Sequence, residues 1–105
     1  MSAELTLTCD LEVTNRAGLH TRVALMIFKK TQEFSGSVTL RKQGTGVTAD
    51  CRRMIDILAL GAAQGDFVTL TVIGHNAESL QKELITLFEN KFYEDEYEEE
   101  RSDEE

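Results

Sequence analysis

The feature that most constrains the fold is a change of apolar period early in the chain. Residues 5 to 13 alternate apolar and polar side chains, which places one set of side chains on one face of a strand. From Thr21 to Phe34 the apolar positions instead repeat at helical spacing, and Ser35-Gly36 ends the pattern. The chain therefore begins with a half-buried strand, a loop over residues 14 to 19 and an amphipathic helix.

The later segments repeat this alternation of strand and helix. Residues 37 to 49 contain two short alternating runs around a glycine-rich connection, which predicts a hairpin. A short apolar helix over about 51 to 60 follows Asp50, a residue suited to cap it, and a fourth strand follows over 68 to 72. Asn76 is then expected to cap the last helix.

The predicted order is β-α-β-β-α-β-α. Strands with one apolar face and helices with one apolar stripe favour a two-layer arrangement. We therefore predict an α+β open-faced sandwich, in which a four-stranded antiparallel sheet carries three helices on one face.

Charge divides the chain into two parts. The net charge is -8, and residues 94–105 alone hold nine acidic side chains and one arginine, so the remainder is balanced. We predict one domain over 1–92 and an acidic, disordered tail over 93–105 that serves solubility rather than docking. An acidic tail on a neutral body argues against nucleic acid as a partner, and we expect a monomer.

The sequence lacks the features that mark several other classes of protein. It has no apolar run of the roughly 18 residues that a membrane helix needs, so we expect no direct membrane insertion. Residues 1 to 4 do not resemble a signal peptide, so we expect a cytoplasmic location, where Cys9 and Cys51 stay reduced. Neither metal-ligand spacing nor a nucleotide-binding motif is found, so we expect no metal and no cofactor.

The candidate site is Gly18-Leu19-His20-Thr21-Arg22, between the first strand and the first helix. A helix start binds anions because its first amides point outward and its dipole favours negative charge. Gly18 permits a sharp turn, and Arg22 offers a fixed cation for a phosphate or carboxylate. His20 could act there as a nucleophile that receives a phosphoryl group. The alternative is an ordinary polar residue at a helix terminus.

This motif resembles the active site of the HPr phosphocarriers of the bacterial sugar phosphotransferase system. The order of elements over residues 4 to about 91 is similar as well, and so is the apolar run 54–62. The resemblance implies that His20 accepts a phosphoryl group on Nδ1 from phosphorylated Enzyme I and passes it to sugar-specific EIIA domains. It implies a carrier acted on by phosphotransferases rather than an enzyme, with Gly18, Thr21 and Arg22 holding the phosphate.

The resemblance also places a docking face on the second helix. The residues expected there are Arg52, Arg53, Met54, Ile55 and Leu58. For the apolar members the alternative is closure of the core, and for the arginine pair it is simple solvation. The helix is short, so we expect its apolar side chains to be partly exposed.

Two residues depart from the family pattern. Val23 stands where the family commonly has proline. Valine should make the helix start that holds the phosphate only slightly less rigid. Arg53 stands where many members carry a regulatory serine, so phosphorylation by the dedicated kinase should be absent.

Two alternatives to a sugar-transport carrier remain open. One is a regulatory protein of the same fold that signals through His20 to a non-sugar partner. The other is a small module that binds a free anion. His75, the second histidine, is interpreted as a residue of the capping region.

Overall fold

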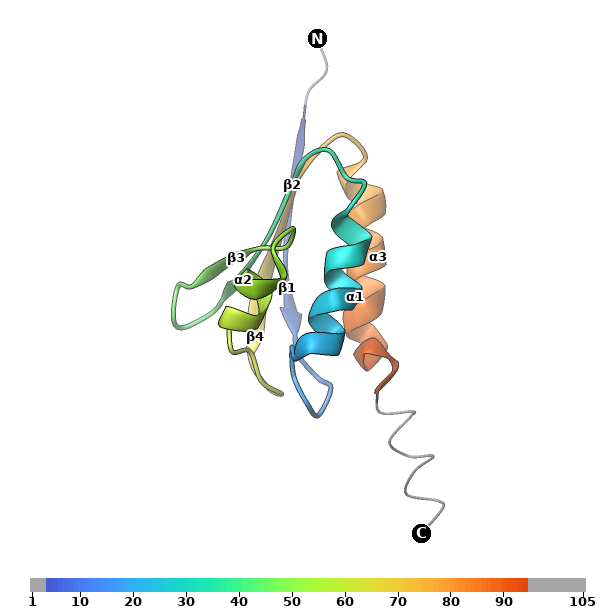
Figure 1. The fold of residues 1–105 in the computed structure, drawn as a ribbon. Coiled ribbons are helices and arrows are strands. Elements are labelled where there is room, and N and C mark those ends of the chain that lie inside the picture. The colour runs from blue at the N-terminus through green and yellow to red at the C-terminus, as the bar shows by residue number, and fades with distance from the viewer. Residues whose placement is uncertain (1–3, 95–105) are drawn as a thin grey trace.

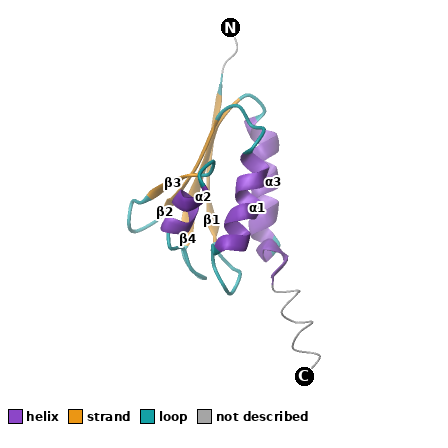
Figure 2. Cartoon of the chain, viewed as in Figure 1, coloured by secondary structure: helices purple, strands orange, loops and turns teal. Residues whose placement is uncertain are grey.

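The computed structural model describes residues 4–94 (Figure 1). Its elements follow the predicted order, with one short 3-10 helix, η1, added at the end (Figure 2). They are β1 (Leu5–Glu12), α1 (Thr21–Thr31), β2 (Ser37–Lys42), β3 (Thr48–Asp50), α2 (Met54–Ala59), β4 (Phe67–Gly74), α3 (Ala77–Glu89) and η1 (Lys91–Tyr93).

The sheet has the strand order β1-β4-β2-β3, and each neighbouring pair is antiparallel. Pairing of Leu40 with Ala49 confirms the predicted hairpin, and β4 runs between β1 and β2. The helices cover one face, with α1 and α3 side by side and α2 near β3 (Figure 1). Lys30 and Glu83 form an ion pair between α1 and α3, with 3.3 Å between Nζ and Oε1. The open-faced sandwich is confirmed.

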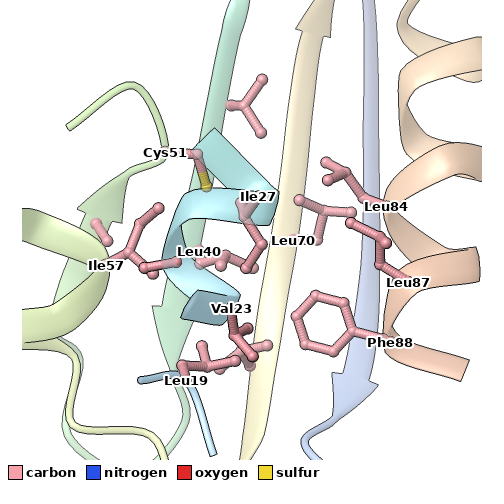
Figure 3. Packing of buried hydrophobic residues seen from close by; sticks show 14 of the residues in the cluster. Leu19, Val23, Ile27, Leu40, Cys51, Ile57, Leu70, Leu84, Leu87 and Phe88 are labelled. Atoms are coloured by element: carbon pink, nitrogen blue, oxygen red, sulfur yellow. The ribbon is translucent and has the colours of Figure 1, made fainter. Parts of the chain in front are cut away.

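The core lies between the sheet and the helices (Figure 3). Val23 and Ile27 reach it from α1, Ile57 from α2 and Leu84 from α3. Each helix is amphipathic and turns one apolar stripe toward the sheet, so apolar side chains at helical spacing are buried. This core fixes α1 to the sheet and thereby fixes the position of its first residue.

The boundaries and caps of the helices differ from the predictions. Helix α1 ends at Thr31 rather than near Phe34, and the Thr31 hydroxyl donates to the Phe28 carbonyl at 2.9 Å. Asp50 does not cap α2, because this helix begins only at Met54. The Asp50 carboxylate instead accepts the Arg52 amide at 3.0 Å and forms a local turn. Asn76 is the N-cap of α3, but its side chain makes no capping hydrogen bond and its φ is 66°.

The C-terminal end of the described chain folds back onto the domain. Lys91, Phe92 and Tyr93 have φ values of 54°, 52° and 62°, a left-handed run that L-residues rarely adopt. Phe92 is completely buried, and its ring contacts that of Phe88 edge-on at 4.9 Å between centroids. Burial of Phe92 holds this turn in place.

The packed domain extends past the predicted boundary at residue 92. Glu94 is buried at 5% exposure, although its charge placed it in the predicted tail. Charge patterning misplaced it because a carboxylate can be buried where hydrogen-bond donors meet it. The rest of the predicted tail, 95–105, lies outside the described residues. Within residues 4–94, no helix is both long enough and apolar enough to span a bilayer.

Candidate functional site

The loop before α1 is fixed by a close contact with the exit of α2. The Leu19 amide donates to the Ala62 carbonyl at 3.0 Å, and Gly18 has a φ of 74°. A Cβ atom on Gly18 would lie 2.6 Å from the Ala62 oxygen. Glycine is therefore required here both for its conformation and for this close approach.

His20 is the N-cap residue of α1. Its backbone is extended, and its carbonyl accepts the Ala24 amide at 2.8 Å in the first turn of the helix. The side chain is 38% exposed. His20 thus stands at the end of α1 where the helix amides and dipole favour an anion.

The Nε2 atom of His20 lies 2.5 Å from Oε2 of Glu94. A carboxylate only accepts hydrogen bonds, so Nε2 carries the proton in this contact. Among residues 4–94, no hydrogen bond is made at His20 Nδ1. The two nitrogens of the ring therefore have different environments.

Asn15 connects Glu94 to the loop that precedes the helix. Its side-chain amide donates to Glu94 Oε1 at 2.9 Å and to the Gly18 carbonyl at 2.8 Å. Asn15 is completely buried. Each carboxylate oxygen of Glu94 thus faces its own donor, and the carboxylate is held in one orientation.

The predicted phosphate-binding residues lie at the start of α1. Thr21 and Arg22 are its first two residues, and both are exposed. First-turn amides have no acceptor within their own helix, so they are directed at an incoming anion. Val23, in place of proline, is completely buried and packs into the core.

The residues predicted for docking have different environments on and before α2. Ile55 is 69% exposed and Leu58 is also exposed, whereas Met54 packs partly against the core. Ile57, not Ile55 or Leu58, closes the core from this helix. Partial exposure of the apolar residues is confirmed. Helix α2 packs against α1.

The two arginines before α2 also differ from each other. Arg53 pairs with Asp56, with 3.6 Å between Nε and Oδ1, and most of its side chain is exposed. Nε and Nη2 of Arg52 are buried, and neither has a hydrogen-bond partner within the part of the chain that the structure describes.

Two residues of chemical interest, His75 and Cys51, lie outside this site. His75 is exposed beside α3 and makes no hydrogen bond with any residue of 4–94. Burial, with a smaller contribution from Asp50, raises the pKa of the Cys51 thiol to about 12, so this cysteine is a core residue. Over the described range, no three His, Cys, Asp or Glu side chains come close enough together to hold a metal ion.

Sequence patterning did not predict Asn15 or Glu94. Asn15 lies in the loop that was predicted, but an asparagine in a loop is common. Glu94 opens an acidic run, which conceals it. A usable signal is the spacing of Phe88 and Phe92, four residues apart, which continues the apolar stripe of α3 toward Glu94.

Comparisons with a protein-family model and with known proteins identify relatives of this chain. The family model described as "PTS HPr component phosphorylation site" matches residues 7–90. Phosphocarrier protein HPr of Xylella fastidiosa is 31% identical over 86 residues, which cover 82% of this chain and 94% of that protein. Phosphocarrier protein NPr of Escherichia coli is 32% identical over 91 residues, which cover 87% of this chain and all of that protein.

A solved structure agrees with these sequence matches. The crystal structure of HPr-C-His from Thermoanaerobacter tengcongensis aligns with a TM-score of 0.68 and 29% identity, covering 87% of this chain and 96% of that one. Fold and matches together define a small phosphoryl carrier of the phosphotransferase system rather than a catalyst. The chain belongs to the HPr family.

Proposed function

We propose that this chain carries a phosphoryl group on Nδ1 of His20, received from phosphorylated Enzyme I and delivered to EIIA domains. The observation that carries the proposal is the position of His20 as the N-cap of α1 with Nε2 bonded to Glu94. Nδ1 is then the nitrogen whose electron pair can attack phosphorus. A carrier of this kind works in the cytoplasm.

The start of α1 would hold the transferred group. The amides of Thr21 and Arg22 belong to the first turn of the helix, and the guanidinium of Arg22 adds a charge-assisted contact. Gly18 lets the loop before His20 approach the Ala62 carbonyl closely, which fixes the loop that leads to the helix start. Strong burial is absent at Thr21 and Arg22, which suits a group that must be released as readily as it is accepted.

Docking is assigned to α2 and the residues before it. Ile55 and Leu58 supply exposed apolar surface, and Arg53 supplies exposed positive charge for an acidic partner surface. Arg52 belongs to the same face, although its Nε and Nη2 atoms are buried. The carbonyl of Ala62, just after this helix, bonds the loop that leads to His20. A partner that docks on α2 would therefore reach the phosphorylation site as well. With Arg53 at the usual serine position, regulation by the serine kinase is absent.

A second role is compatible with the same site. Proteins named HPr and NPr match this chain at similar identity, so the family match alone does not select the acceptor. In the regulatory alternative, His20 is phosphorylated but no sugar-specific EIIA domain receives the group.

The test follows the phosphoryl group from donor to acceptor. The full chain is incubated with Enzyme I and labelled phosphoenolpyruvate, and the product is assayed for phosphate that is acid-labile and base-stable. We expect wild type and His75→Ala to be labelled and His20→Ala to remain unlabelled. Labelling of His20→Ala, or none of wild type, would contradict the carrier function.

Addition of purified EIIA domains then separates the two roles. Loss of label from the chain with gain by EIIA supports the carrier for transport. Label that stays on His20 in the presence of every sugar-specific EIIA tested supports the regulatory role. Binding of inorganic phosphate without any donor protein would support the free-anion module.

A further inference from the structure

Glu94 lies outside the Gly18-to-Arg22 motif, yet its side chain contacts the histidine of that motif. We propose that Glu94 is a positioning residue: its carboxylate accepts the Nε2 proton of His20 and thereby keeps Nδ1 unprotonated for attack on phosphorus. This proposal rests on the proposed function of His20 as the phosphoryl acceptor.

The geometry selects one tautomer of the imidazole. A neutral imidazole carries one proton, on either nitrogen, and the partner of one nitrogen decides which. Glu94 Oε2 lies 2.5 Å from Nε2 and can only accept, so the proton is held there. The electron pair of the neutral ring is consequently on Nδ1.

The carboxylate is fixed from both sides. Its Oε1 atom accepts from Asn15 at 2.9 Å, and the same amide of Asn15 bonds the Gly18 carbonyl. Asn15 is completely buried and Glu94 is nearly so. Because each oxygen has a donor, rotation of the carboxylate would break one of two buried hydrogen bonds.

The backbone before Glu94 supports a functional placement. Three successive left-handed residues, Lys91 to Tyr93, are unfavourable by about 1–2 kcal/mol each for L-residues. Such conformations persist only where surrounding packing determines them, here through buried Phe92, and they concentrate at functional sites. The result of this turn is that Glu94 reaches the first residue before α1.

The same contact assists transfer in both directions. The Nδ1 electron pair forms the new N–P bond while the bond between phosphorus and its donor atom on Enzyme I breaks, and the electron pair of that bond returns to the donor atom. The Nε2 proton stays between His20 and Glu94. The ring gains positive charge as the bond forms, and the adjacent carboxylate stabilises that charge. Release to an acceptor follows the reverse path.

Glu94→Gln is the informative substitution. A glutamine side chain has one acceptor oxygen and one donor amide, so it cannot accept from both Asn15 and His20. If its amide faces His20, the proton moves to Nδ1. We expect ring ¹⁵N NMR to show the Nε2-protonated tautomer in the wild type and loss of that preference in Glu94→Gln. Uptake from phosphorylated Enzyme I should fall about 10- to 100-fold, as when carboxylates that orient metal-binding histidines are removed.

Two variants keep the test specific. Glu89→Gln removes the same charge from an exposed site at the end of α3 and should leave both the tautomer and the rate unchanged. Glu94→Asp keeps two acceptor oxygens and should recover part of the lost rate, which makes the test independent of the stability of Glu94→Gln.

The outcomes separate this proposal from the function on which it rests. An unlabelled wild type would overturn the carrier function itself. A labelled wild type with equal rates and equal tautomers in Glu94→Gln would overturn only the positioning role. Faster uptake by Glu94→Gln would also overturn it, because Glu94 would then act by repelling the phosphoryl group.

Discussion

The two histidines of the domain both precede a helix, yet only one has a partner that gives it a defined chemistry. His20 leads into α1 and bonds Glu94, which comes from the far end of the chain. His75 leads into α3 and is exposed, without a hydrogen bond to the described residues. The local sequence is similar, since a glycine precedes each histidine by one or two positions. The difference is therefore a tertiary one.

The left-handed residues at the two helix starts show the same contrast. At α1 this residue is Gly18, which packs on the Ala62 carbonyl and has no room for a side chain. At α3 it is Asn76, which is exposed and has φ 66°. A helix start supplies anion affinity in both places, but among residues 4–94 only the start of α1 is hydrogen-bonded to two distant segments, at Ala62 and at Glu94.

Phe92→Ala should have the largest effect, because it removes the anchor of the turn that delivers Glu94. Loss of a buried phenylalanine costs about 3–5 kcal/mol in the free energy of unfolding. Tyr93→Ala, at an exposed neighbour, should cost under about 1 kcal/mol. Chemical denaturation measures both. Equal effects would show that the turn is not held by Phe92.

Gly18→Ala should come next and should act on the α1 start alone. A left-handed alanine and a Cβ atom 2.6 Å from the Ala62 oxygen together predict a loss of about 2–4 kcal/mol. Gly44→Ala is the matched control, since Gly44 has φ 91° with open space around it. Only the backbone term then remains, about 1–2 kcal/mol. If Gly18→Ala is no worse than this control in denaturation, the contact with Ala62 does not constrain the loop.

Asn76→Gly should have the smallest effect. Glycine adopts the same left-handed conformation, and the Asn76 side chain makes no capping hydrogen bond that could be lost. We expect a change within about 0.5 kcal/mol in thermal or chemical unfolding. A loss above about 1 kcal/mol would show that the α3 start is constrained as α1 is, and would weaken the contrast between the two histidines.

Local patterns in the sequence predict the helices and strands, but they do not predict features that depend on contacts between residues far apart in the chain. Over residues 4–94, alternation and helical spacing locate the four strands and the three α-helices, and the Gly18-to-Arg22 motif lies where the first helix begins. The predicted cap of α2 was wrong, because Asp50 is also suited to a turn. Its carboxylate accepts a hydrogen bond from the Arg52 amide instead. Propensity alone cannot decide between these two uses.

Glu94 shows the same limit within the site. Its identity and its acidic neighbours indicate a solvated tail, and only a run of three left-handed residues brings it back to His20. No local pattern predicts such a run in residues other than glycine. What decides the outcome is the burial of Phe92, a long-range packing effect.

The most direct test of the account is to locate the phosphoryl group on the intact chain. After treatment with Enzyme I and phosphoenolpyruvate, ³¹P and ¹⁵N NMR should show one phosphorylated nitrogen, Nδ1 of His20, while the ring of His75 is unchanged. A phosphoryl group on His75, on Nε2 of His20 or on neither histidine would contradict it.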